Sequence, residues 1–501
     1  MEESVEIIAI RIGKNVLSLL VSFVAKVVSG FLIVVVIARL SGVEEVGDWS
    51  TVIAFTWTFT ALMDFGLNRL LVPEIAKRRD EADIYVSNSI ALCILFGLIG
   101  WMAMALIVNW LEYPQRVIHA VYLAGLAQVL YVLAGLIQSA FRAFERMELE
   151  TLSVGFQEAV FLVCAIGVLY FALPFLWIFV VYAFSRLAGV SSAWLLYRNH
   201  LGYLRPRLNP QICWELLIKG WPFAVFSALS MLYLRADVLL LSLFHGAAAV
   251  GYYEVAANLF LRLNVFARTV NTSLLPLLSR EYAISGKEIR KYLNPTIKYQ
   301  AILALPMTFG GLILAPQIIE FFYAGGYEAS ILLFQLLIGF VMLRFVDHTL
   351  GITLTAIGQQ TRRVVALGGA TAINLLLNAV LIPRYSYLGA TMSSIFTEIF
   401  LFIALYLFLS RWVPGVIRLQ IFIKPMLGAV VMSAPILILK NLPLPLLVPL
   451  GAATYILALF LLKSFSVEET RTILKLVEML GVVPKPIRRR LADALLARSE
   501  G

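Results

Sequence analysis

The dominant pattern along the 501 residues is a succession of apolar stretches, most of about 18 residues or more, separated by short polar segments. A stretch of this length can cross the roughly 30 Å hydrocarbon core of a bilayer as an α-helix. The pattern therefore predicts an all-α integral membrane protein with about 14 transmembrane helices. The predicted spans are 16–40, 48–68, 86–110, 117–139, 151–172, 175–197, 220–243, 251–278, 299–323, 331–357, 364–383, 387–409, 420–439 and 444–462.

The composition supports this prediction. Hydrophobic residues make up 61% of the chain and charged residues 14%, against about 45–50% and about 25% in soluble domains. The first span is longer than the core of a signal peptide and lacks a small-residue cleavage site, so we expect it to be retained. The three cysteines, Cys93, Cys164 and Cys213, are scattered. Their spacing predicts neither a disulfide framework nor a metal site.

Basic residues indicate how the spans are oriented. Most of the 40 Lys and Arg residues fall in one alternate set of loops and in the tail. The opposite set holds only Arg39, Arg116, Arg384 and Lys440. Because short cytoplasmic loops carry the excess of positive charge, we expect both termini in the cytoplasm of a cell membrane protein. The net charge of +10 then reflects topology and attraction to anionic lipid, not nucleic-acid binding.

Two short motifs repeat at nearly the same offset. Val46–Trp49 opens the second span and Val250–Tyr253 opens the eighth, and Pro73 and Pro276 lie near the far ends of these spans. Since the spans are six apart, the repeat predicts two parallel lobes of six helices with a site between them. Shared membrane-protein composition is the alternative explanation. The predicted domains are lobes 1–205 and 206–410, helices 13 and 14 in 411–463, and a basic cytoplasmic tail, 464–501.

Six basic residues fall inside predicted spans. A charge at this depth costs about 2.5–3.5 kcal/mol by insertion scales and usually faces a cavity or a partner. Arginine also offers a planar fork that matches phosphate oxygens. These positions therefore predict a cationic cavity that binds an anionic head group. The candidate residues are Lys26, Arg186, Arg235, Arg262, Arg268 and Arg344.

Five further residues are candidates for a polar cavity or a gate. They are Asp64, Asp237, Glu254, Asn258 and Thr269. The last three share one face of the predicted eighth span. Asp64 lies near the inner face and fits a structural cap or loop anchor as well as it fits a gate. Arg235 and Asp237 are two residues apart and point in different directions, so each needs a partner on another span.

Two alternatives stay open for the deep charges. They can form ion pairs between helices, or their side chains can extend along the helix to the membrane interface. The second alternative suits Arg268, which lies nearer the cytoplasmic end of its span. His348 beside Asp347 is explained more simply as a packed pair than as a proton relay.

Enzyme signatures are missing from the sequence. There is no HExxH, GxSxG, Walker A or dinucleotide-binding glycine pattern. We therefore expect a protein that is not an enzyme and that has no catalytic residues, metal or cofactor.

Several stretches resemble a known family, the Wzx-type polysaccharide transporters. These oligosaccharide flippases belong to the MOP superfamily, together with lipid II flippases and MATE multidrug antiporters. The resemblance implies two six-helix lobes around a cationic cavity, and transfer of a polyprenyl-diphosphate-linked oligosaccharide from the inner to the outer leaflet. It also places Arg235 and Asp237 at the cavity and makes spans 13 and 14 an accessory pair. The matching stretches are VGDW (46–49), DFGLNRLLVPEIAKRR (64–79), FRAFERME (141–148), YLRADVLLLSLF (233–244) and VGYYEVAANL (250–259).

The sequence thus favours a flippase for cell-surface polysaccharide synthesis that works by alternating access. Its expected partners are a lipid-linked oligosaccharide and membrane lipids, with a glycan polymerase or glycosyltransferases as further candidates and no nucleic acid. A proton gradient, a sodium gradient and the membrane potential are all open as driving forces. One rival is a MATE-like drug or metabolite antiporter, for which we expect a more acidic cavity. The other is a membrane-embedded glycan polymerase or ligase, which would be expected to need a large outer loop.

Overall fold

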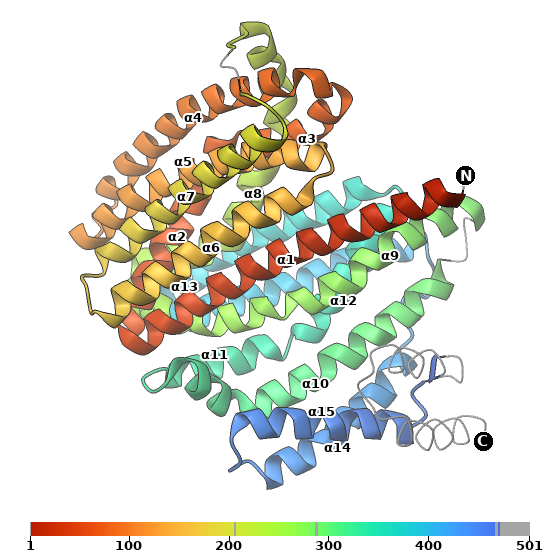
Figure 1. The fold of residues 1–501 in the computed structure, drawn as a ribbon. Coiled ribbons are helices and arrows are strands. Elements are labelled where there is room, and N and C mark those ends of the chain that lie inside the picture. Colours follow the sequence, from red (N-terminus) through yellow and green to blue (C-terminus); the bar gives the residue numbers. More distant parts are fainter. Residues whose placement is uncertain (1, 205–206, 286–288, 466–468, 471–501) are drawn as a thin grey trace. The chain divides into compact units, whose positions relative to one another are not determined.

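The computed structural model describes residues 2–204, 207–285, 289–465 and 469–470 (Figure 1). Within these ranges the secondary structure is helical, without strands, which confirms the predicted all-α class. The helices are α1 (Glu2–Leu40), α2 (Val43–Asp64), α3 (Leu67–Lys77), η1 (Arg79–Glu81), α4 (Ala82–Trp110), α5 (Gln115–Ala143), α6 (Met147–Tyr170), α7 (Leu176–His200), α8 (Pro210–Arg262), α9 (Asn264–Ser285), α10 (Arg290–Tyr323), α11 (Glu328–Ile338), α12 (Val341–Ala356), α13 (Gln360–Ser410), α14 (Gln420–Ile438) and α15 (Leu444–Leu461).

The helices of the described residues account for the predicted spans. Eleven are long and apolar enough to cross a membrane, and α11 with α12 adds a span that is bent by 43°. Two helices, α8 with 53 residues and α13 with 51 residues, are far longer than one crossing needs. Both contain a residue with non-helical backbone angles, Gly246 (φ 75°) and Ser386 (φ 52°). Each therefore consists of two segments.

Contacts across these breaks show that the chain reverses there. Arg235 lies 3.5 Å from Glu254, although a straight helix would separate the two residues by about 28 Å. A Cβ atom on Gly389 would lie 2.3 Å from the carbonyl oxygen of Leu381, about 12 Å along a straight helix. Both helices are thus hairpins of two antiparallel segments, which brings the described crossings to about 14.

The chain divides into two compact units. The first holds Met1–Asn258, Tyr323–Tyr327 and Thr371–Ser394, and the second holds Leu259–Phe322, Glu328–Ala370 and Ile395–Gly501. The two units are defined by contacts within the chain, and their bounds differ from those of the six-helix lobes that the repeat predicts. The division into two six-helix lobes, an accessory pair and a tail stays a prediction.

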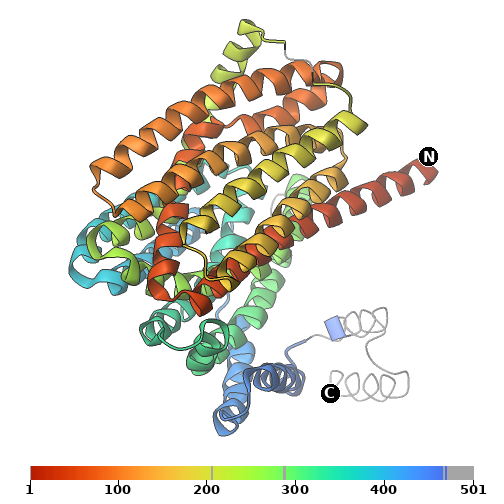
Figure 2. The ribbon, with the colours of Figure 1, turned by 60° about the vertical axis from the view of Figure 1, so that its left-hand side comes forward.

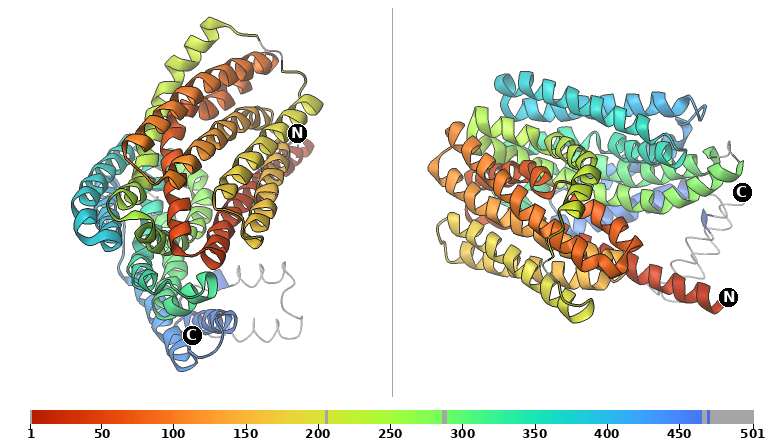
Figure 3. Two further views of the ribbon diagram at one scale, coloured as in Figure 1. Left: turned by 90° about the vertical axis from the view of Figure 1, so that its left-hand side faces the viewer. Right: turned by 90° about the horizontal axis from the view of Figure 1, so that it is seen from above.

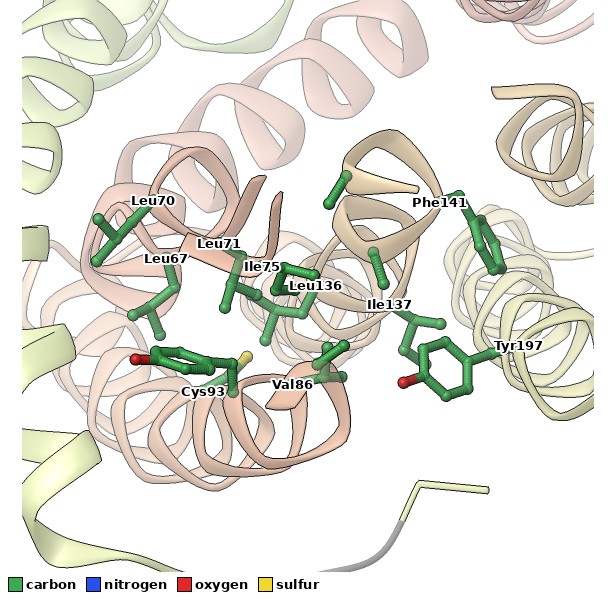
Figure 4. Packing of buried hydrophobic residues seen from close by; sticks show 14 of the residues in the cluster. Leu67, Leu70, Leu71, Ile75, Val86, Cys93, Leu136, Ile137, Phe141 and Tyr197 are labelled. Carbon is green, nitrogen blue, oxygen red and sulfur yellow. The ribbon is translucent and has the colours of Figure 1, made fainter. Parts of the chain in front are cut away.

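In the first unit, α6 packs along α1 and α7, while α5 packs against α4 and α7 (Figures 1 and 2). A cluster of buried apolar side chains joins α3 to α4, α5 and α7 (Figure 4). It includes Leu67 and Leu71 of α3, Leu136 of α5 and Tyr197 of α7. Because lipid is as apolar as these side chains, close packing rather than water exclusion holds them together.

In the second unit, α9 packs against α12, and α14 packs against α15 (Figure 3). The pair α14 and α15 shares a buried cluster with α10 that includes Ala301, Met432 and Tyr455. A salt bridge of 2.7 Å joins Lys298 of α10 to Glu469. The predicted last two spans are therefore a packed hairpin.

Loops that the charge pattern assigns to one side of the membrane contact one another in the first unit. On the predicted outer side the contacts are Arg116 with Glu44 (3.6 Å), His245 with the Ile382 carbonyl (2.8 Å) and Tyr327 with the Ala38 carbonyl (3.1 Å). On the predicted inner side they are Arg79 with Glu145 (3.6 Å), Lys219 with Glu74 (2.9 Å) and Lys14 with Glu148 (3.7 Å). These contacts agree with the predicted alternation of the loops between the two sides of the membrane. Which of the two sides faces the cytoplasm stays a prediction.

Cysteine labelling tests this orientation. In a variant without native cysteines, Asp80→Cys and Glu145→Cys should react only with a thiol reagent that crosses the membrane. Glu112→Cys and Gln115→Cys should react with a reagent confined to the outside, because all four side chains are exposed and the charge rule places the two pairs on opposite sides. The reverse pattern would refute the predicted topology.

Candidate functional site

Lys26 projects from α1 into the helix packing of the first unit. The side chain is half-buried, and its Nζ lies 5.8 Å from the centroid of the Tyr131 ring on α5. On neighbouring turns of α1, Ser22 and Ser29 are buried, and the Ser22 hydroxyl donates to Thr151 of α6 over 2.8 Å. This polar face of α1 therefore contacts protein and not lipid. Within the described part of the chain, no carboxylate lies at salt-bridge distance from Lys26.

Arg186 of α7 lies near the same aromatic ring but carries its own counter-ion. Its Nη1 is 3.0 Å from Glu158 Oε1 of α6, and both side chains are about nine-tenths buried. The guanidinium lies 4.5 Å from the centroid of Tyr182 and 5.1 Å from that of Tyr131. Two helices thus each place a cationic group within about 6 Å of the centroid of the Tyr131 ring, α1 with Lys26 and α7 with Arg186. This distance is typical of cation–π attraction. Of the two cations, Lys26 is the one without an ion pair.

The charged residues of α8 find their partners across the hairpin, as the sequence predicts. Arg235 lies 3.5 Å from Glu254 and its guanidinium 5.6 Å from the centroid of Trp57. Asp237 accepts a hydrogen bond from the Tyr253 hydroxyl, which is also 3.2 Å from Ser394 Oγ. Each pairing joins the first segment of α8 to its second segment. Arg235 is therefore compensated in this conformation.

Arg344 forms the corresponding compensated site in the second unit. Its Nη1 is 3.0 Å from Glu398 Oε2 and its Nε donates to Asn264 Oδ1 over 2.9 Å. In the same unit Arg262 is half-buried and Arg268 is exposed. The side chain of Thr269 lies outside the described residues. The three arginines of this unit thus differ in burial, and Arg344 forms an ion pair between α12 and α13.

The remaining polar candidates have structural contacts. Asp64 ends α2, and its Oδ1 accepts hydrogen bonds from the backbone and side-chain nitrogens of Asn68 at 3.1 and 2.5 Å. This is the loop-anchor alternative, because it stabilises the break between α2 and α3. Glu254 and Asn258 are buried, at 7% and 4% exposure. In this conformation they therefore face packed protein and not open water.

Sequence reasoning identified the internal repeat but missed the contact that its two copies make. A Cβ on Gly47 would lie 1.8 Å from the Ala247 carbonyl oxygen, and a Cβ on Gly251 would lie 2.1 Å from the Val43 carbonyl oxygen. Val43 corresponds to Ala247, and Gly47 corresponds to Gly251, at the offset that separates the two motifs. Each glycine therefore meets the residue four positions before the other glycine, and the contact is reciprocal. We call it the α2–α8 glycine contact. Only glycine allows the two backbones to approach this closely.

The chain is similar to several known proteins. A family model described as "Polysaccharide biosynthesis protein" matches residues 12–281. A Shigella flexneri protein named as an O-antigen transporter is 23% identical over 394 residues, covering 71% of this chain and 88% of that protein. A Haloferax volcanii protein named as a low-salt glycan biosynthesis flippase is 23% identical over 215 residues, covering 42% of this chain and 45% of that protein.

Solved structures share the fold. The lipid II flippase MurJ in an inward closed conformation has a TM-score of 0.72 at 15% identity, covering 88% of this chain and 98% of that chain. An inward-facing multidrug transporter of the MATE family has a TM-score of 0.63 at 14% identity, covering 79% of this chain and 98% of that chain. At these identities the likeness concerns the fold alone.

Removal of one partner of the Arg186–Glu158 pair should destabilise the protein. Glu158→Leu leaves a buried guanidinium without a counter-ion, which costs about 3–5 kcal/mol in comparable pairs. The double variant Glu158→Leu with Arg186→Met removes both charges and should recover most of this loss. Thermal unfolding in detergent measures both. Equal unfolding temperatures for the single variant and the wild type would show that the pair has no structural role.

Proposed function

The chain belongs to the family of polysaccharide biosynthesis proteins, and we propose that it is a flippase for a polyprenyl-(di)phosphate-linked oligosaccharide. It moves this substrate from the inner to the outer leaflet of the cell membrane, for cell-surface polysaccharide or glycoconjugate synthesis. Two relatives, named as an O-antigen transporter and as a glycan biosynthesis flippase, support a transporter and not an enzyme. Lipid-linked oligosaccharide and membrane lipids are then its partners.

The uncompensated charge of Lys26 carries this proposal. An ammonium group at membrane depth costs about 2.5–3.5 kcal/mol by insertion scales unless an anion or water offsets it. Arg186, Arg235 and Arg344 each have a carboxylate within 3.5 Å, whereas Lys26 contacts the face of Tyr131. A phosphate group beside Lys26 would supply the missing negative charge. Arg186 lies against the same Tyr131 ring, but Glu158 already balances its charge.

Alternating access requires that the outer end of the transporter can close and open. The α2–α8 glycine contact supplies the closed state, because it joins two helices of the predicted lobes at their outer ends with almost no space between the backbones. We propose that this contact is broken when the sugar head group leaves on the outer side.

Three driving forces suit the proposed transport: a proton gradient, a sodium gradient and the membrane potential. A proton or sodium gradient can be coupled to the buried carboxylates, and the membrane potential alone acts on a charged substrate with about 2.3 kcal/mol per charge and 100 mV. Glycosyltransferases would deliver the substrate, and a glycan polymerase would receive it. A MATE-like antiporter is the rival function, and transport of an organic cation in exchange for protons or sodium distinguishes it.

Replacement of Lys26 tests the head-group site. Lys26→Ala should be inserted and folded, but should export lipid-linked glycan at least about tenfold more slowly, because a charge-assisted hydrogen bond is worth about 1.5–3 kcal/mol. Lys26→Arg keeps the charge and should retain part of the activity. Glycan accumulated on the inner leaflet is measured in cells that depend on this transporter. Export at the wild-type rate by Lys26→Ala would refute the site.

Substitution of the two contact glycines tests the gate. Gly47→Ala and Gly251→Ala place a Cβ where the opposing carbonyl lies, so the outer end should favour the open state. A cysteine introduced at Ala54, which is buried on the same helix two turns further in, should then react with an outside thiol reagent. Gly155→Ala and Gly167→Ala are matched controls, since nothing lies within 4 Å of their Cβ positions. Equal labelling in all four variants would show that the contact does not close the outer end.

A further inference from the structure

A polar pocket lies next to the α2–α8 glycine contact, on the predicted outer side of the first unit. Its cavity volume is about 310 Å³. The start of α2, the loop before α5 and the turn at Gly246 of α8 line it. Gly246 and Ala247 belong to this lining, and Ala247 provides the carbonyl that meets Gly47. The pocket is therefore separate from the deep cationic residues and borders directly on the contact that closes the outer end.

Three charged side chains that pair with one another, those of Arg116, Asp48 and Glu44, form part of the pocket lining. Arg116 Nε lies 2.8 Å from Asp48 Oδ2, and Arg116 Nη2 lies 3.6 Å from Glu44 Oε2. Asp48 is 3% exposed, whereas the Arg116 side chain is half exposed. Two carboxylates share one guanidinium. This part of the lining therefore offers more hydrogen-bond acceptors than donors, and its donors are the exposed N–H groups of Arg116.

Another part of the lining combines a hydroxyl pair with apolar surface. The Tyr113 and Ser242 hydroxyls are 2.7 Å apart, and Pro114 also belongs to the lining. Burial raises the pKa of Tyr113, and the bond to Ser242 only partly offsets this. The phenol is therefore protonated at neutral pH and can donate to a ligand.

This combination fits a sugar ring. A pyranose presents hydroxyls in its plane, which carboxylates, a guanidinium and a phenol can bind, and it presents C–H groups on its faces, which pack on apolar rings. The volume is at the small end of the range of about 300–1,000 Å³ for ligand pockets, enough for one sugar and not for a whole oligosaccharide. Among the described residues no group of three His, Cys, Asp or Glu side chains could hold a metal ion.

We propose that this pocket binds one sugar unit of the transported glycan on the outer side of the glycine contact. The proposal rests on the flippase function proposed above and extends it to a second subsite. A sugar that occupies the pocket contacts the turn at Gly246 and Ala247, which also forms the closing contact. Occupancy of the pocket is thereby linked to separation of α2 from α8, and the glycan is held outside while its lipid passes.

Photo-crosslinking in cells tests the subsite. A photoreactive amino acid replaces Pro114, which lines the pocket, or Leu173, an exposed residue of another predicted outer loop that serves as the control. A third reporter replaces Tyr131 beside Lys26. The probe is radiolabelled lipid-linked oligosaccharide made by the host. We expect crosslinks at positions 114 and 131 but not at 173.

Variants of the pocket separate binding from general damage. Asp48→Asn and Tyr113→Phe should lower the crosslink yield at position 114 about tenfold or more, and leave that at position 131 within about twofold. Crosslinking at 131 without any at 114, or crosslinking at 114 that neither variant changes, would overturn the pocket proposal. Absence of crosslinks at both 114 and 131, with no glycan export, would instead contradict the flippase function itself.

Discussion

The energetic cost of a charge inside the membrane governs the arrangement of this protein. An arginine at membrane depth is tolerated when a partner or water offsets its charge, and three of the deep arginines pair with a carboxylate: Arg186 with Glu158, Arg235 with Glu254 and Arg344 with Glu398. These pairs fix which helix faces meet. Lys26 differs, since its ammonium group lies over the ring of Tyr131, and under the proposed function this charge is the one that binds an anionic head group. In this proposal, structure and function depend on the same energetic penalty.

The internal repeat acquires a physical meaning from the α2–α8 glycine contact. Gly47 and Gly251 come from equivalent positions of the two motifs, and each meets the carbonyl of the residue four positions before the other. Such a reciprocal contact brings two backbones together at equivalent positions of the two motifs. It joins the predicted outer ends of two helices that the proposed transport cycle must separate, and it borders the polar pocket of Asp48 and Arg116.

The sequence predicted the fold well, because lipid imposes a simple rule: every span needs an apolar stretch of sufficient length. It predicted two separate spans where α8 forms its hairpin, and it predicted that Arg235 and Asp237 each need a partner on another span. It could not identify those partners, Glu254 and Tyr253, because pairing depends on how helices rotate against one another. The break after Asp64 was not predicted either, since Phe65 adopts a left-handed conformation (φ 46°) that its residue type does not announce. The pocket at Tyr113 and Arg116 was missed because its residues come from three separate loops and helix ends.

The central claim is that the chain moves a lipid-linked glycan and not a drug-like cation. Purified protein in liposomes with a fluorescent polyprenyl-diphosphate oligosaccharide tests this directly, when a membrane-impermeant glycosidase reports which leaflet holds the glycan. The account predicts that the protected fraction falls in the presence of the wild-type protein and stays constant with Lys26→Ala. A protected fraction that never changes, together with exchange of an organic cation for protons or sodium by the same vesicles, would contradict it.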